Sequence, residues 1–419
     1  MKSTHTSLIA IAALMLPAFI GQAGDYSGKA LVLNDKEPSL VEISLNTRLR
    51  YEYGELNGLD VSHAWTVRNR LGLLSRKTAG FQAYAEYEGN VAADRDQYFA
   101  PGTEPATGQT PIADAESHEL NQAWVSYTTM DDVWGLKVGR QAINLDGQRF
   151  IGTVGWRQNM QTYDAATLTW NPNSDLSVLY SYVSGVERIF GSETVIPGFD
   201  DFEGSSHLFN AKYKGLPFGI LTGYVYSLDL HNGAGDANSS DTFGFSLAGE
   251  FIGESAYYLE YAYQTNAYSN PNDYAANYVH TSLAKSFLPG VKTTVGYEYL
   301  GSDNRIGFAT PLGTLHKFNG FADQFLTTPA SGLSDAYLSV STKLAEINFA
   351  AAYHYFWDDG FDVSLGQEID LIASKALTDE ISILAKAAFY DGMAGTAAGT
   401  AGFPALDATR FILEMNINY

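Results

Sequence analysis

Apolar and polar residues alternate one by one along many stretches of this chain. Between positions 41 and 53 the odd-numbered residues are mostly apolar or aromatic, whereas Glu42, Arg48 and Arg50 lie between them. The same alternation runs through residues 411–419 up to the terminal Tyr419. A period of two places successive side chains on opposite faces of a β-strand. Each stretch therefore predicts a strand with one apolar face and one polar face.

The connections between these stretches alternate in length. About eighteen strands are expected, at 41–53, 63–75, 80–91, 119–129, 133–143, 162–170, 175–187, 206–214, 217–229, 241–252, 255–265, 275–287, 291–301, 335–344, 346–358, 366–376, 380–391 and 408–419. The long connections are 54–62, 92–118, 188–205, 302–334 and 392–407. The short ones are 76–80, 171–174, 215–216, 253–254, 288–290 and 378–379.

Long loops at one end of a sheet and short turns at the other are typical of outer-membrane barrels. Closure also satisfies the edge hydrogen bonds of a sheet, which cannot stay open in lipid. The chain has 27 Tyr and 23 Phe, and many of them lie at strand ends, as in aromatic belts. We therefore expect an all-β protein, a transmembrane antiparallel up-and-down β-barrel over 41–419, with long extracellular loops and short periplasmic turns. It would contact the lipids of the outer membrane of a Gram-negative-type bacterium.

The two ends of the chain support this location. Residues 1–23 combine an early lysine, an apolar stretch and the small-residue pattern Gly21-Gln22-Ala23, which together predict a cleaved signal peptide. Residues 24–40 would then form a periplasmic segment before the barrel. The alternating strand 411–419 is the part that we expect the barrel-assembly machinery to recognise.

The composition excludes several classes of protein. Lys and Arg number 25 against 47 Asp and Glu, a formal net charge of −22, so the chain lacks the basic surface of a nucleic-acid-binding protein. There is no cysteine, so a disulfide framework is excluded. Acidic groups at 94–96, 200–203 and 358–362 offer oxygen ligands but not the spacing of an EF-hand. We expect no cofactor beyond weak Ca²⁺ binding in these outer loops.

The polar parity of the strands predicts a charged lumen. Arg48, Arg50, Arg68 and Arg70 lie on the first two strands, and Glu250, Glu260 and Glu298 lie on strands across the ring. One hypothesis is a wall of arginines facing a wall of carboxylates. The other is mutual neutralisation, because Glu86 and Glu88 are placed to pair with the arginines of the next strand.

A block of motifs between residues 136 and 170 resembles the alginate export family of outer-membrane porins. It contains G-R-Q at 139–141, R-F-I-G at 149–152 and W-R-Q at 156–158, the last followed by the aromatic–Asp pair 163–164. The resemblance implies a single-chain barrel of eighteen strands with a basic translocation path, and it adds three arginines to the site. The predicted pore-lining and substrate-binding residues are Arg48, Arg50, Arg68, Arg70, Glu86, Glu88, Arg140, Arg149, Arg157, Glu260 and Glu298.

The function that we expect is passive diffusion of small hydrophilic solutes, polar or anionic, through a general or semi-selective porin. A dedicated exporter of an anionic polysaccharide such as alginate is the alternative. A hydrolase in the barrel wall is disfavoured because His354 stands without a G-x-S-x-G or H-E-x-x-H motif. A structural or adhesive barrel would carry no current. The long loops 92–118 and 302–334 are the candidates to fold inward and narrow the lumen.

Overall fold

The computed structural model describes residues 40–103, 108–196, 198–251, 255–393 and 406–419. The expected signal peptide at 1–23 lies outside these residues, as does nearly all of the segment 24–40. The expected turn at 253–254 and most of the loop 392–407 are outside them too.

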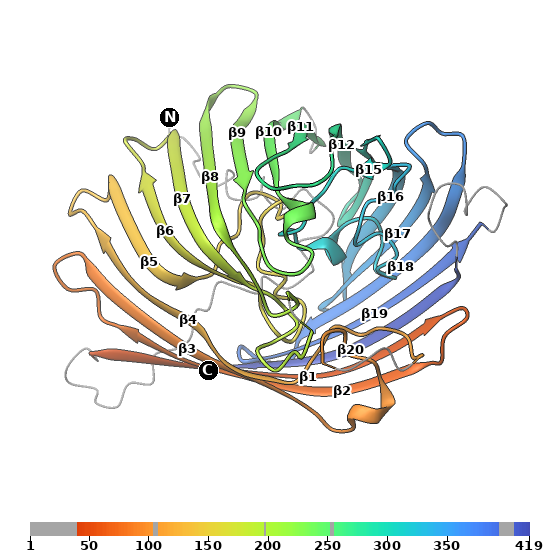
Figure 1. Cartoon of the computed structure of the whole chain (residues 1–419), viewed down its shortest axis with the longest axis horizontal. Helices are drawn as coiled ribbons and strands as arrows, with labels where there is room; N and C mark the ends of the chain where they lie inside the picture. The colour runs from red at the N-terminus through yellow and green to blue at the C-terminus, as the bar shows by residue number, and fades with distance from the viewer. Residues whose placement is uncertain (1–39, 104–107, 197, 252–254, 394–405) are drawn as a thin grey trace.

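Eighteen strands form one antiparallel sheet that closes on itself (Figure 1). The strands are β1 (Val41–Leu56), β2 (Ser62–Ser75), β3 (Phe81–Ala92), β4 (Ser117–Thr128), β5 (Trp134–Gln141), β6 (Thr162–Trp170), β7 (Leu176–Glu187), β8 (Asp201–Leu216), β9 (Gly219–Leu228), β10 (Ser240–Phe251), β11 (Ser255–Asn266), β12 (Ala275–Leu288), β13 (Val291–Leu300), β16 (Leu333–Leu344), β17 (Ile347–Trp357), β18 (Ser364–Ala376), β19 (Ile381–Gly392) and β20 (Ala408–Asn418). The barrel closes where β1 pairs with β20, from Asn46 opposite Asn418 to Leu56 opposite Ala408.

Short elements lie in the connections. β14 (Ser302–Asp303) and β15 (Ile306–Gly307) form a separate hairpin between β13 and β16. The described part of the chain has three single 3₁₀ turns, at η2 (Arg95–Gln97), η3 (Asp236–Asn238) and η4 (Leu315–Lys317). Among the described residues, no helix is long and apolar enough to cross a membrane.

The expected strands are all present, with small differences at their ends. The turn at 76–80 between β2 and β3 is as predicted, whereas β1 continues to Leu56 and β8 begins at Asp201. These additional residues lie at the ends that lead into the long connections. We take that end as extracellular, since outer-membrane barrels carry their long loops outside.

The two faces of each strand differ as the alternation predicts. On β1, Leu45 and Leu49 are about two-fifths exposed, whereas Arg48 and Arg50 are buried. The outward face is therefore apolar because it meets lipid, and the inward face is polar. On β11, Tyr257 bonds to the carbonyl of Phe218 near a periplasmic turn, and Tyr261 bonds to Asn277 toward the outside. These two hydroxyls point away from Leu259, which therefore lies near the middle of the apolar band.

Replacing Leu259 by arginine places a charge near the centre of the lipid band. We expect the Leu259→Arg variant to lose about 2–4 kcal/mol of unfolding free energy in lipid vesicles. Thr265→Arg, on the same outward face but beyond the outer tyrosine, is the matched control and costs about 0–1 kcal/mol. Equilibrium denaturation in vesicles measures both, and equal losses would contradict the assigned depth.

Candidate functional site in the barrel lumen

Two segments of chain fold into the barrel and fill much of its interior. We call residues 142–161, between β5 and β6, the first inward loop, and residues 301–332, between β13 and β16, the second inward loop. They contact each other through a backbone bridge between Ile151 and Leu312 and a 2.9 Å hydrogen bond from the Thr314 amide to the Gln148 carbonyl. The lumen is thus lined by loop residues as well as by the strands.

Loop 302–334 therefore folds inward, as one of the two candidates from the sequence. The other, 92–118, sends its last part inward, where Ile112 and Asp114 are fully buried. The first inward loop was not expected to do so. Its sequence motifs indicate the family resemblance, but the loop has no alternating pattern from which its inward position could be predicted.

Arg48 of β1 holds the backbone of the first inward loop against the wall. Its Nη1 donates to the carbonyl oxygens of residues 155–157, each at 3.1 Å. Its Nε bonds to Asn416 of β20 at 2.9 Å and lies 3.4 Å from Glu414. A guanidinium has five N–H donors in a fixed plane, so it can satisfy several buried carbonyl groups at once.

Arg50 is two residues further along β1 and faces the same side. It joins β20, the loop after β3 and the first inward loop. Its guanidinium forms ion pairs with Asp114 at 3.0 Å and with Glu414 at 2.6 Å, and it bonds to the carbonyl of Trp156. Burial alone would raise the pKa of Asp114, but the charges of Arg50 and Arg157 lower it below its ordinary value. Asp114 is thus held as a carboxylate that ties the loop after β3 to the wall.

Arg157 of the first inward loop links both loops to the barrel. It pairs with Glu52 of β1 at 3.0 Å and with Asp323 of the second inward loop at 2.9 Å. Glu52 also binds Arg410 of β20 at 2.8 Å. All four side chains are nearly or fully buried. Removing one partner would leave a charge buried without compensation, which is costly.

Arg68 and Arg70 of β2 are also buried and locally paired. Arg70 forms an ion pair with Glu88, and Arg68 bonds to Asn46. Glu88 further accepts a hydrogen bond from the amide of Met160 in the first inward loop at 3.0 Å.

Glu86 of β3, the other carboxylate expected beside these arginines, is bound by neutral side chains. It accepts hydrogen bonds from Tyr84, Asn121 and Gln122 at 2.6, 2.7 and 3.1 Å. On this side of the barrel the arginines and carboxylates are therefore intermixed.

The opposite side is richer in carboxylates. Glu298 of β13 pairs with Arg149 of the first inward loop at 2.8 Å. Glu260 of β11 accepts hydrogen bonds from Tyr224 and Tyr258, both at 2.8 Å. The structure therefore separates the charges across the lumen in part, while the arginines near β1 and β2 keep local carboxylate partners.

His354 of β17 lies on this carboxylate-rich side. Its Nδ1 bonds to Asp335 at 2.9 Å, and its Nε2 lies 3.7 Å from Asp370. Its ring stacks on Phe356 and packs against Tyr337.

Arg140 lies apart from these groups. Its guanidinium binds Asp164 at 2.9 Å and Glu187 at 2.5 Å, at the extracellular ends of β5, β6 and β7. Arg140 shares its parity with the outward-facing Leu136 and Val138. Arg140 and its two carboxylate partners, Asp164 and Glu187, are all partly exposed. The structure thus places this predicted lumen residue on the outer side of the wall.

His316 forms a latch between the second inward loop and the wall. Its Nδ1 donates to Asp323 at 2.7 Å and its Nε2 accepts from Lys386 of β19 at 3.0 Å. The ring stacks between Trp156 and Phe321, with centroid distances of 3.3 and 5.0 Å. Burial lowers the pKa of His316 to about 3, so the ring stays neutral. We call this group the His316 latch.

Five lysines point inward near the periplasmic turns, and reasoning from motifs did not single out this group. Their positions follow from strand parity, which was the signal available to find them. They are Lys137 of β5, Lys212 and Lys214 of β8, Lys292 of β13 and Lys343 of β16. At the same level the inward parity carries the glutamates Glu42 and Glu250. Two of these lysines have carboxylate partners, Lys212 with Asp146 at 3.2 Å and Lys343 with Glu346 at 2.6 Å. Among the described residues, the inward strand positions near the periplasmic turns therefore carry three lysines without an ion pair, which are Lys137, Lys214 and Lys292.

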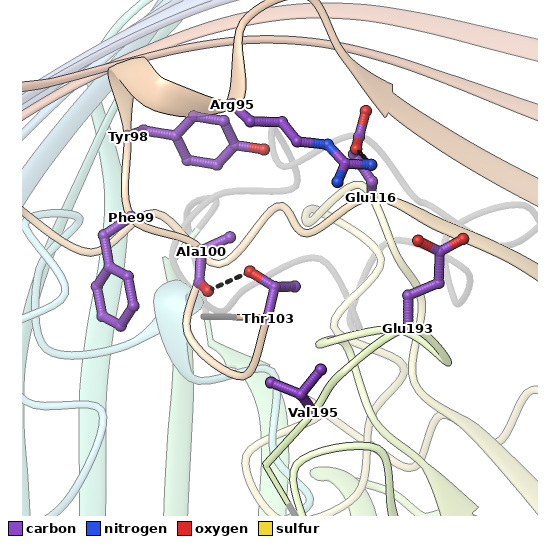
Figure 2. Close-up of a pocket in the computed structure, with 8 residues that line it drawn as sticks. All are labelled: Arg95, Tyr98, Phe99, Ala100, Thr103, Glu116, Glu193 and Val195. Carbon is purple, nitrogen blue, oxygen red and sulfur yellow. Dashed lines mark hydrogen bonds and ion pairs between the residues drawn. The ribbon is translucent and has the colours of Figure 1, made fainter. Parts of the chain in front are cut away.

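A pocket of about 220 Å³ opens on the extracellular side between the loops after β3 and β7 (Figure 2). Arg95 pairs there with Glu116, and Glu193 and Val195 come from the other loop. The Val195 amide donates to the carbonyl of Gly102 at 2.8 Å. Glu116 follows Asp114 by two residues. The same segment of chain therefore borders this pocket and contacts Arg50 and Arg157 in the lumen.

The acidic outer loops were the expected weak Ca²⁺ sites. In the part of the chain that the structure describes, no group of three or more His, Asp or Glu side chains is arranged to hold a metal ion. Asp358 instead accepts hydrogen bonds from the amides of Asp362 and Val363, at 2.8 and 3.1 Å. Ca²⁺ binding in these loops stays a prediction.

The sequence model described as alginate export matches residues 40–308. OccAB4 of Acinetobacter baumannii has a TM-score of 0.69 at 13% identity, covering 92% of this chain and 100% of that one. The outer membrane protein opdK of Pseudomonas aeruginosa has a TM-score of 0.67 at 10% identity, covering 90% and 99%. No curated protein sequence matches significantly. The predicted fold, an outer-membrane barrel of eighteen strands, is confirmed.

The His316 latch makes loop packing depend on pH. Between about pH 3 and 6.5 a released His316 takes up a proton that the packed ring refuses, so the latch is stable at neutral pH and weakens as pH falls. We expect current noise in planar bilayers to rise from pH 7.5 to 4.5. In His316→Asn the noise is high at neutral pH and changes less with acid.

His231→Asn is the control for this experiment, because His231 lies on an exposed loop beside Asp236. It should keep the acid response of the unmodified protein. An unchanged pH response in His316→Asn would show that the latch does not govern the loops.

Proposed function

The chain belongs to the alginate export family, and on this premise we propose that it is an outer-membrane channel through which small hydrophilic, anionic solutes diffuse passively. The observation that carries the proposal is the predominance of inward-facing lysines at the periplasmic mouth. Fixed charges that line a pore raise the local concentration of ions of the opposite sign. The inward strand positions at this level carry five lysines against two glutamates. Lys212 and Lys343 are neutralised by Asp146 and Glu346, and the three other lysines favour anions.

The two inward loops support a limit on solute size. Residues 155–157 are bound to Arg48, and Arg157 joins Glu52 to Asp323 across the space between wall and loop. These buried contacts keep loop residues where a wide passage would otherwise run. Polar groups that remain at the lumen surface then offer hydrogen bonds to small solutes in place of bulk water.

Export of an anionic polysaccharide is the second candidate, and the family match favours it. A polymer chain needs a continuous passage, so the loops would have to leave the lumen. That movement breaks the pairs of Arg157 with Glu52 and Asp323, and buried pairs are strongly destabilised when one partner is withdrawn. The structure therefore supports small solutes better.

We propose no catalytic role for the barrel. His354, the candidate base from the sequence, is bound to Asp335 and packed against Tyr337 and Phe356. Nucleophilic catalysis requires a nucleophile within hydrogen-bond reach of its base. A structural or adhesive barrel is separated from a channel by conductance, since it would carry no current.

Reversing two of the inward lysines tests the charge argument. We expect Lys214→Glu with Lys292→Glu to lower the anion-to-cation permeability ratio by about threefold or more, because two positive charges at the mouth become negative. Lys285→Glu with Lys375→Glu is the matched control, as both residues face outward near periplasmic turns, Lys285 at the same turn as Lys292. Reversal potentials in a salt gradient measure the ratio. Equal shifts in both variants would contradict a role for the lumen lysines.

Liposome swelling tests the size limit. We expect small organic acids and monomeric uronic acids to enter proteoliposomes, and uronic-acid oligomers of about ten residues to be excluded, because paired loops narrow the lumen. Neutral sugars of matched size serve as the control for charge. Swelling with the oligomers as fast as with the monomers would favour the polysaccharide exporter.

A further inference from the structure

One hydrogen-bond geometry is shared by six hairpins around the outside of the described barrel. In each case an outward-facing tyrosine bonds to a side chain on the next strand, two residues closer to the extracellular end than the residue directly opposite. The distances range from 2.7 to 3.1 Å. The pairs are Tyr51–His63, Tyr87–His118, Tyr180–His207, Tyr261–Asn277, Tyr297–Ser334 and Tyr353–Gln367. In the β7–β8 hairpin Tyr182 repeats the geometry with Ser205 at 3.3 Å, beside the pair of Tyr180 with His207.

All six pairs lie in hairpins that are joined by extracellular loops. A tyrosine ring is apolar in its body and polar at its hydroxyl, so it settles where hydrocarbon gives way to headgroups. The common upward direction of the six hydroxyls marks this boundary on the extracellular side. The partner side chains therefore lie at the level of the lipid headgroups.

The ring is divided by the chemistry of these partners. In the hairpins β1–β2, β3–β4 and β7–β8 the partner is a histidine, and in β11–β12, β13–β16 and β17–β18 it is an amide or a hydroxyl. We call His63, His118 and His207 the histidine arc. Each of them bonds to its tyrosine through Nδ1. With the tyrosine hydroxyl donating, the ring proton sits on Nε2 and is available to an acceptor.

The other basic groups on the outward face of the described strands are either at the periplasmic end or already paired. The outward-facing lysines Lys285 and Lys375 lie near periplasmic turns, at the other end of the barrel. Arg140 lies in the same sector as the arc, but Asp164 and Glu187 bind it. Imidazole is also the side chain that gains a charge near neutral pH when an anion approaches.

We propose that the histidine arc binds phosphate groups of the glycolipid in the outer leaflet. A phosphate oxygen accepts a hydrogen bond from Nε2–H. That bond is charge-assisted when the ring carries both protons, and the Nδ1–H then donates to the tyrosine oxygen. The amide and hydroxyl partners in the other half of the ring cannot gain a charge in this way. One sector of the barrel, from β1 to β8, is therefore the lipid-binding side. The glycolipid is assigned because the arc lies at the extracellular end.

Carboxylates near the histidine arc offer a second way to bind a phosphate, through a bridging divalent cation. Glu55 bonds to Tyr53 at 2.7 Å, and Glu203 is exposed on β8 above His207. A divalent cation between such a carboxylate and a phosphate would bind lipid without any histidine. Binding is therefore measured with a chelator present.

The test replaces all three histidines by glutamine. Glutamine keeps the tyrosine bond, since Gln367 accepts the same bond from Tyr353 at 2.7 Å, but it cannot be protonated. With purified protein in detergent and a chelator, native mass spectrometry counts bound diphosphorylated lipid A. We expect the His63→Gln, His118→Gln, His207→Gln variant to lose at least about tenfold in affinity, with single-channel conductance unchanged. Dephosphorylated lipid A should bind weakly to both proteins.

A gain-of-function variant provides the matched control. Adding Asn277→His and Gln367→His to the triple variant places imidazoles in the neutral half of the ring, and we expect them to restore binding of the phosphorylated lipid. Heat-modifiable mobility on gels checks that each variant is folded. If the triple variant does not fold, His118→Gln alone should show a smaller loss of affinity.

Three outcomes would overturn the proposal. The first is equal lipid A binding by the triple variant and the unmodified protein. The second is equally tight binding of phosphatidylglycerol, a lipid of the periplasmic leaflet, which would remove the assignment to the outer leaflet. The third is a changed oligomeric state without a change in lipid binding, which would make the arc an interface with a second copy of the chain.

Discussion

The backbone hydrogen bonds of the sheet must all be satisfied in lipid, and this constraint determines the rest of the structure. It requires the closure of β1 on β20, from Asn46 opposite Asn418 to Leu56 opposite Ala408. Once the ring is closed, each strand has one face in lipid and one in the lumen. The side of each charged residue on a strand is then decided by its parity, and Arg48 and Arg50 both face inward.

Charges sent into a narrow lumen need partners, because water is displaced by the inward loops. Arg48 uses three loop carbonyls, and Arg157 uses Glu52 and Asp323. The paired network therefore does two jobs: it neutralises buried charge and it fixes the loops that set the width of the passage. On the proposed function, the charges left to act on solutes are those nearer the ends, among them Lys137, Lys214 and Lys292, whose side chains remain partly exposed.

Parity could be read from the sequence, and it predicted the strands, the barrel and the inward position of Arg48, Arg50, Arg68 and Arg70. Loop conformation could not be read in this way. The first inward loop has no period, and its place depends on contacts with distant residues, such as the bond from the Gln158 amide to Asp114. Arg140 shows the converse: its motif suggested the lumen, but it shares the parity of Leu136 and Val138 and lies outside.

Parity also lets one strand serve two environments independently. On β2, His63 faces the headgroup level while Arg68 and Arg70 face the lumen. A substitution at His63 changes contacts with lipid and leaves the ion pairs of the lumen intact, since the two sets of side chains lie on opposite sides of the sheet. Lipid binding and solute selectivity can therefore vary separately in this fold, although the residues responsible for them are only a few positions apart.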